Sequence, residues 1–81
     1  MNPTVVSVLA NQDYILEIEF KNGEKRIFSM KPYLDYPVFR PVNDYKLFIT
    51  ARATMGFVSW NDDSDLSHDT LYLDSKIKAT V

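Results

Sequence analysis

The stretch YILEIEFKNGEKRIF, residues 14–28, decides the fold of this chain, because two runs of β-branched and aromatic residues flank one pair of turn-forming residues. That pair, Asn22-Gly23, readily adopts the positive φ angles of a type I′ turn, so the stretch predicts a two-stranded hairpin. The two-residue turn predicts three cross-strand pairs: Ile18 with Ile27, Glu19 with Arg26, and Lys21 with Glu24. One face of the hairpin should be apolar and carry Tyr14, Leu16, Ile18, Phe20 and Ile27. Phe28 then lies at the polar-face end beside Ile15, where a second layer or a partner would have to cover it.

Length and composition limit the class of protein. The 81 residues predict a single domain over 1–81, with a core at about 4–74. The absence of cysteine excludes disulfides, thiolate zinc sites and cysteine nucleophiles, and it fits a reducing cytoplasm. Five Phe, five Tyr and one Trp are expected to supply the core. Neither a signal-peptide pattern nor an apolar run of roughly 20 residues is present, so a cytoplasmic protein without membrane contact is expected.

The formal charge of −2 is unevenly distributed. Residues 1–52 hold seven Lys and Arg against six Asp and Glu, whereas residues 53–81 hold two against five. No basic stripe interleaves with aromatic residues, so nucleic-acid binding is not expected of this chain alone.

The segments around the first hairpin complete a small sheet. Val5–Leu9 predicts a strand and Asn11–Asp13 a turn, so the first three strands should form an antiparallel meander. Ile49–Thr54 and Phe57–Trp60 predict a second hairpin around Met55-Gly56.

Proline and capping residues predict the helices and complete the fold class. Three short helical segments are expected: residues 33–36 between Pro32 and Pro37, residues 44–48 behind Asn43, and residues 68–74 behind Ser67. The last should present Leu71 and Tyr72 to the core, and residues 75–81 are either a frayed tail or an edge strand marked by Ile77 and Val81. The order β-β-β-α-α-β-β-α predicts an α+β domain, with short helices on one face of a small, mainly antiparallel sheet.

An acidic segment is the one cluster that could carry chemistry, and it contains Asp62, Asp63, Asp65, His68 and Asp69. It lacks the glycine and the closing glutamate of a calcium loop, and its single histidine with exposed carboxylates (Asp63, Asp65, Asp69) makes a weak metal site. His68 is the only histidine, but no nucleophile motif accompanies it. We interpret the segment as a solvated turn whose acids favour a helix N-terminus, and we predict no catalytic residue, cofactor site or cofactor.

Two glutamates on the first hairpin offer a second arrangement. Glu17 and Glu19 share a strand face and could act as paired carboxylates in glycoside chemistry. A cross-strand pair of Glu19 with Arg26 on a solvated face is the favoured interpretation. Gly23 and Gly56 are both needed for turns, so no phosphate-binding glycine loop is expected.

Aromatic residues crowd the connection between the two hairpins, at Tyr33, Tyr36, Phe39 and Tyr45. With Trp60 and Tyr72 they either form the core of a small cysteine-free domain or line a protein-binding surface, where Tyr and Trp are favoured anchors. These four residues are the predicted partner-binding residues.

The ordered motifs resemble a family of small bacterial proteins, domain-of-unknown-function family 2442. The resemblance is carried by Asp13-Tyr-x-Leu-x-x-x-Phe-x-Asn-Gly-Glu-x-Arg-x-Phe28, Met30-Lys-Pro-Tyr-Leu34, Val38-Phe39, Leu47-Phe48, Gly56-x-Val-x-Trp60 and Asp65-Leu-x-x-Asp-x-Leu-Tyr72. It covers roughly residues 4–74. The chain departs from the family pattern at Asn61–Ser64, where Pro-Asn-Gly is expected, and at Ser67, where an acidic or similar cap is expected.

The resemblance implies a compact α+β domain without an established activity. Family members often lie beside a second small protein, in pairs proposed as toxin–antitoxin systems, and some carry a C-terminal helix-turn-helix for which this chain has no room. We therefore expect a non-enzymatic interaction domain, the antitoxin-like or regulatory half of a two-protein system, with a small protein partner or a second copy of itself. The alternatives are a metal- or ligand-binding domain or enzyme that uses residues 62–69 and, more weakly, a DNA-binding autoregulator.

Overall fold

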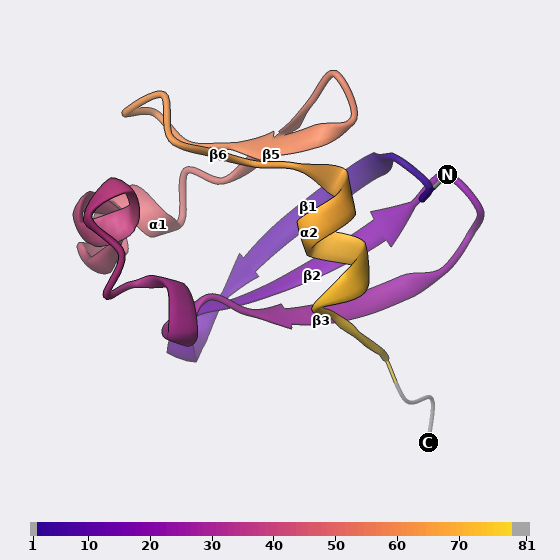
Figure 1. Cartoon of the computed structure of the whole chain (residues 1–81), viewed down its shortest axis with the longest axis horizontal. Coiled ribbons are helices and arrows are strands. Elements are labelled where there is room, and N and C mark those ends of the chain that lie inside the picture. The colour runs from indigo at the N-terminus through magenta and orange to yellow at the C-terminus, as the bar shows by residue number, and fades with distance from the viewer. Residues whose placement is uncertain (1, 79–81) are drawn as a thin grey trace.

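The computed structural model describes residues 2–78 and arranges their strands in two antiparallel sheets (Figure 1). Sheet A has the order β1-β2-β3-β7, and sheet B has the order β4-β5-β6. The strands are β1 Val5–Asn11, β2 Ile15–Phe20, β3 Lys25–Ser29, β4 Arg52–Thr54, β5 Phe57–Ser59, β6 Asp65–Leu66 and β7 Lys76–Ile77. The α-helices are α1 Tyr45–Phe48 and α2 His68–Leu73, and the 3-10 helices are η1 Gln12–Tyr14, η2 Lys31–Tyr33 and η3 Pro37–Asn43. The predicted α+β class and the antiparallel meander of the first three strands are confirmed.

The first hairpin forms as predicted, but its register differs by one residue. Ile18 pairs with Arg26 and Glu19 pairs with Lys25, so the predicted pairs of Ile18 with Ile27 and Glu19 with Arg26 are wrong. The loop is Lys21–Gly23, closed by a hydrogen bond of 2.9 Å from the Gly23 amide to the Phe20 carbonyl. Gly23 has φ +89°, whereas Asn22 does not take a positive φ, so the turn is not type I′. Lys21, in the loop, therefore does not pair with Glu24.

The shifted register changes which residues of β3 enter the core. Leu16 pairs with Phe28, which is fully buried, whereas Ile27 pairs with Glu17 on the opposite face and is partly exposed. The prediction that Ile27 belongs to the apolar face is therefore wrong. Phe28 needs no partner protein to cover it, since the ring of Tyr33 packs on it at 5.3 Å between centroids.

The second hairpin contains the type I′ turn. Thr54 pairs with Phe57, and both intervening residues have positive φ: +50° at Met55 and +91° at Gly56. The strand before this turn, β4, is shorter than predicted, because residues 47–51 continue from α1 as a hydrogen-bonded turn, with the Thr50 amide donating to Leu47. The two-residue strand β6 was not predicted, and it joins the second hairpin into sheet B.

In the connection between the hairpins, the prolines occupy other positions in the helices than the sequence predicted. Pro37 begins η3 rather than ending a helix, and Pro41 lies inside it, because a short 3-10 helix needs few backbone donors. Asp44 caps α1 by accepting from the Lys46 amide, so the assignment of Asn43 as the cap is wrong. Ser67 caps α2 through the Thr70 amide, as predicted.

The helices and sheet B all lie on one face of sheet A. In Figure 1, α2 crosses in front of β1, β2 and β3, and its Tyr72 packs on Phe20 with ring centroids 5.1 Å apart. The core residues range from Val5 to Leu71 and include Trp60, whose Nε1 donates to the Phe48 carbonyl at 2.9 Å. β7 pairs with β3 at Arg26 and Ile27, so Ile77 lies in an edge strand, while Val81 falls outside the described residues. Within residues 2–78, no helix is long and apolar enough to cross a membrane.

Candidate functional site

The four predicted partner-binding residues are divided between two ring clusters. Tyr33 is the centre of the first, with Tyr36 at 5.7 Å and Phe39 at 6.3 Å between centroids, both edge-on. Tyr45 belongs to the second cluster, with Tyr14 at 5.9 Å and Phe48 at 6.1 Å. The structure thus places the four predicted residues in two separate ring clusters rather than one, and their role in partner binding stays a prediction.

Exposure separates the four residues by role. Phe39 is buried and Tyr33 is half-buried, so these two rings belong to the packing of the domain. Tyr36 is 54% exposed and Tyr45 is 40% exposed, although each ring rests against other rings. Phe39 and Tyr33 thus contribute to the packing of the domain, whereas Tyr36 and Tyr45 are accessible from solvent.

Tyr33 also connects this region to the end of α2. Its hydroxyl donates a hydrogen bond to the Asp74 carboxylate. That hydrogen bond, together with burial, raises the pKa of Tyr33 to about 12, so the phenol stays neutral at physiological pH. The hydrogen bond to Asp74 thus fixes the ring of Tyr33, against which Tyr36 packs.

The acidic segment forms local caps rather than a ligand-binding cluster. Asp62 accepts from both the amide and the hydroxyl of Ser64, and Asp69 accepts from the Asn2 side chain at 2.9 Å. His68 Nδ1 lies 3.7 Å from Asp69 Oδ1. Among residues 2–78, no three histidine or acidic side chains come together as metal ligands. The weak candidates Asp63, Asp65, His68 and Asp69 are therefore not assembled into a metal site.

Glu17 and Glu19 lie on the face of sheet A that faces away from the helices. Asn11 and Lys78 both donate to Glu17, and the Lys78 contact, the larger cause, lowers the pKa of Glu17 below its ordinary value. Glu19 has Lys25 rather than Arg26 as its cross-strand neighbour. Glu17 is therefore paired with a lysine, whereas Glu19 and Lys25 are cross-strand neighbours that form no ion pair within the described residues.

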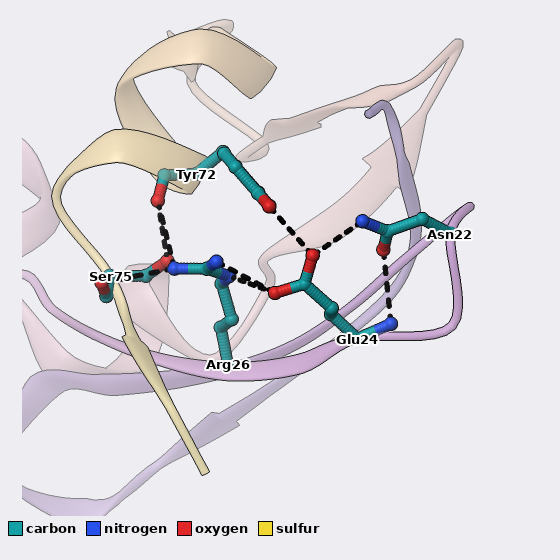
Figure 2. Close-up of polar contacts among 5 residues, drawn as sticks. All are labelled: Asn22, Glu24, Arg26, Tyr72 and Ser75. Atoms are coloured by element: carbon teal, nitrogen blue, oxygen red, sulfur yellow. Dashed lines mark hydrogen bonds and ion pairs between the residues drawn. The ribbon is translucent and has the colours of Figure 1, made fainter. Parts of the chain in front are cut away.

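A polar network that the sequence did not predict joins the first hairpin to α2 (Figure 2). In Figure 2 the Glu24 carboxylate lies between three side chains: Tyr72 donates to it at 2.6 Å, Arg26 at 2.7 Å, and Asn22 donates from the turn. The guanidinium of Arg26 also lies 3.9 Å from the centroid of the Tyr72 ring. These contacts lower the pKa of Glu24, with the Tyr72 hydrogen bond as the largest favourable cause.

Arg26 reaches the C-terminal end of α2 because the observed register turns it toward the core face. Its Nη1 donates to the carbonyls of Tyr72 at 3.4 Å and Ser75 at 3.5 Å. A cation at a helix C-terminus satisfies carbonyls that have no partner within the helix. The available sequence signal was the alternation Glu24-x-Arg26, which puts both charges on one strand face. The network therefore links the C-terminal end of α2 to the first hairpin.

Comparison with known proteins gives one result. The model of a family described as a protein of unknown function (DUF2442) matches residues 5–76. No curated protein and no solved structure matches the chain.

Proposed function

Because the chain belongs to the DUF2442 family, whose description assigns no activity, we propose a function from its surface: a non-enzymatic domain that binds a partner protein. The binding surface would be the "36–49 surface", by which we mean the side chains of Tyr36, Val38, Tyr45 and Ile49. Tyr33 and Phe39 would support it from behind.

The observation that carries this proposal is the concentration of exposed apolar side chains. Among the described residues, nine large apolar side chains are exposed, and four of them are the members of the 36–49 surface. The other five are spread over β1, the second turn, α2 and β7. Single exposed apolar residues are normal on a protein surface, whereas a contiguous apolar patch marks an interaction site, and the proposal takes these four side chains, all from residues 36–49, to form such a patch.

The two tyrosines of this surface are already oriented. Tyr36 is held edge-on by Tyr33, and Tyr45 is held by Tyr14 and Phe48. A ring that is ordered before binding loses little conformational entropy when a partner covers it. Such aromatic residues are the usual energetic anchors of interfaces.

The test is an affinity pull-down from the native host, followed by titration of the captured partner against single variants. Tyr36→Ala and Tyr45→Ala should each weaken binding by about 2 kcal/mol or more while leaving the melting temperature nearly unchanged. The matched control is Leu73→Ala, which removes a 69% exposed side chain from α2 and should leave binding unchanged. If all three variants bind equally well, the 36–49 surface is not the binding site.

We further propose that the partner is a small protein and that this chain is the antitoxin-like or regulatory half of the pair. The family description assigns no role, so this proposal rests on what the resemblance implies and on the exposed tyrosines, which could occlude a functional surface of the partner. Co-expression tests the idea: a growth defect caused by the captured partner should be relieved by the wild-type chain and less by Tyr36→Ala. A partner that is harmless when expressed alone would remove the antitoxin-like role and leave the binding surface in place.

A further inference from the structure

One face of sheet A is left uncovered by the rest of the fold. The helices and sheet B pack on the side that carries Phe20 and Phe28, so the odd-numbered residues of β2 and β3 face outward. We call this outward side the open face, and its central side chains are Leu9, Glu17, Glu19, Lys25, Ile27 and Lys78. An antiparallel sheet can be solvated on one side, so lack of cover alone implies no partner.

The open face is hollowed, and the hollow has a definite charge pattern. A shallow depression of about 240 Å³ lies over β2, with Glu17 and Glu19 among its lining residues. Leu9 of β1 lines one side and Lys25 of β3 lines the other. An acidic row on β2 therefore runs beside a basic row on β3 and β7, which Lys76 and Lys78 extend.

Part of this charge is paired within the chain and part remains available. Lys78 forms an ion pair with Glu17 at 2.5 Å. Within residues 2–78, the Glu19 carboxylate and the Lys25 ammonium make no side-chain hydrogen bond or ion pair, although the two residues are cross-strand neighbours. Leu9 is 60% exposed at the rim of the depression. The face thus offers an anion, a cation and an apolar side chain to an approaching surface.

Symmetry decides which surface fits. A two-fold axis in the plane of the face, parallel to the strands and between β2 and β3, puts the acidic row of each copy opposite the basic row of the other. Glu19 and Lys25 are directly opposite each other on neighbouring strands. The two-fold operation therefore places Glu19 of each copy against Lys25 of the other, which gives two equivalent contacts. The same operation puts β1 opposite β7, where the aliphatic part of a lysine can cover Leu9. An axis perpendicular to the strands would instead oppose acid to acid.

We propose that the open face of sheet A is a dimer interface between two copies of this chain, related by a two-fold axis parallel to the strands. The strand directions of the two sheets stay nearly aligned under this operation, which is the usual arrangement for packed sheets. The Lys25 side chain of each copy enters the depression over β2 of the other copy. This interface is separate from the 36–49 surface, so it stands or falls independently of the proposed partner.

The test is a charge exchange measured by sedimentation velocity. Wild-type chain should dimerise in a concentration-dependent way, and high salt should weaken the dimer, because its central contacts are ionic. Glu19→Lys puts lysine opposite Lys25, and Lys25→Glu puts glutamate opposite Glu19, so each variant alone should associate at least about tenfold more weakly. A mixture of the two variants should form a one-to-one heterodimer, because every cross-copy contact is then again between opposite charges.

Matched controls and outcomes keep the proposal open to failure. Asp35→Lys and Lys46→Glu change exposed charges outside sheet A and should leave dimerisation unchanged. Circular dichroism and melting curves identify any variant that fails to fold, and the double variant Glu19→Lys/Lys25→Glu, which restores opposite charges, should dimerise again. A wild-type chain that stays monomeric at millimolar concentration overturns the proposal. So does a dimer that survives both single reversals, or a mixture that stays monomeric.

Discussion

Both hairpins have a glycine as the second residue of the expected two-residue turn, but the type I′ turn forms in the hairpin whose sequence favours it less. The first has Asn22-Gly23, the pair best suited to a type I′ turn, yet only the glycine takes a positive φ there. The second has Met55-Gly56, in which methionine is a poor residue for positive φ, yet it adopts φ +50° in a two-residue turn. Local turn preference was thus outweighed at both sites, and the physical reasons differ.

In the first hairpin, burial determines the register. A two-residue turn would direct Ile27 toward the core, together with the polar residues Lys25 and Ser29 on the same strand face. The observed three-residue loop instead turns Phe28 inward, along with Met30, and both are fully buried. Each such side chain contributes about 1.5–3 kcal/mol through burial, which exceeds the preference of one turn type over another. Asn22 still contributes, because its side chain accepts from the Glu24 amide at 3.0 Å.

In the second hairpin, a long-range contact holds the turn. The Gly56 carbonyl accepts from the Val5 amide at 2.8 Å, which ties the turn to the start of β1. A Cβ added at Gly56 would lie 3.0 Å from Thr4 Cβ, so the N-terminal segment packs directly on the glycine. The conformation of Met55 therefore follows from what Gly56 touches, and the Met55 side chain is left 93% exposed.

The largest expected effect comes from testing the register of the first hairpin. Phe28→Ala should lower the free energy of unfolding by about 3–5 kcal/mol, since it empties a fully buried site. Ile27→Ala is the matched variant, and a loss of about 1 kcal/mol is expected because Ile27 is only partly buried on the open face. Urea denaturation monitored by tryptophan fluorescence measures both. Equal losses, or a larger loss for Ile27→Ala, would mean that the two-residue register is the correct one.

The next effect contrasts the two glycines. Gly56→Ala should cost about 2–4 kcal/mol, because φ +91° is unfavourable for alanine and the new methyl group meets Thr4. Gly23→Ala should cost only about 1 kcal/mol, since φ is +89° but no other atom lies within 4 Å of an added Cβ. Thermal melts suffice, at roughly 4–8 °C per kcal/mol for a domain of this size. Thr4→Gly should recover part of the Gly56→Ala loss, and equal losses at the two glycines would contradict the packing argument.

These contrasts mark what the sequence could predict. Strand alternation located the first three strands and the second turn, and Ser67 was recognisable as a cap, because each depends on neighbours in sequence. The register, by contrast, depends on residues that lie far apart in the chain. Arg26 meets the Tyr72 carbonyl across 46 positions of sequence, a contact that no local pattern encodes. For the same reason, the four aromatic residues of the candidate site could be named from the sequence, but their division into two clusters could not.

A smaller effect concerns how each hairpin is fastened to the rest of the molecule. The second hairpin is joined to β1 by a backbone hydrogen bond, whereas the first hairpin is joined to α2 by the hydrogen bond that the Tyr72 hydroxyl donates to Glu24. Tyr72→Phe removes that hydroxyl and keeps the ring on Arg26, so a loss of about 1 kcal/mol is expected. Tyr45→Phe is the control and should leave the melting temperature unchanged. Equal melting temperatures for wild type and Tyr72→Phe would mean that the hydroxyl contributes nothing to the fastening.

The smallest effect is a dependence on pH that only the first hairpin has, since the second turn contains no ionisable side chain. The pKa of Glu24 is lowered in the folded chain, chiefly by Tyr72 and also by Arg26 and Asn22. A carboxylate with a lowered pKa stabilises the fold above its ordinary value of 4.5, and that contribution is lost as the pH falls through the folded-state pKa. Glu24→Gln should therefore melt below wild type at pH 7, and the difference should shrink as the pH falls below 4.5 toward the folded-state pKa. Glu17, whose pKa is also lowered, is present in both proteins, so the comparison isolates Glu24. A difference that stays constant from pH 7 to pH 3 would mean that the charge of Glu24 plays no part in holding α2 to the hairpin.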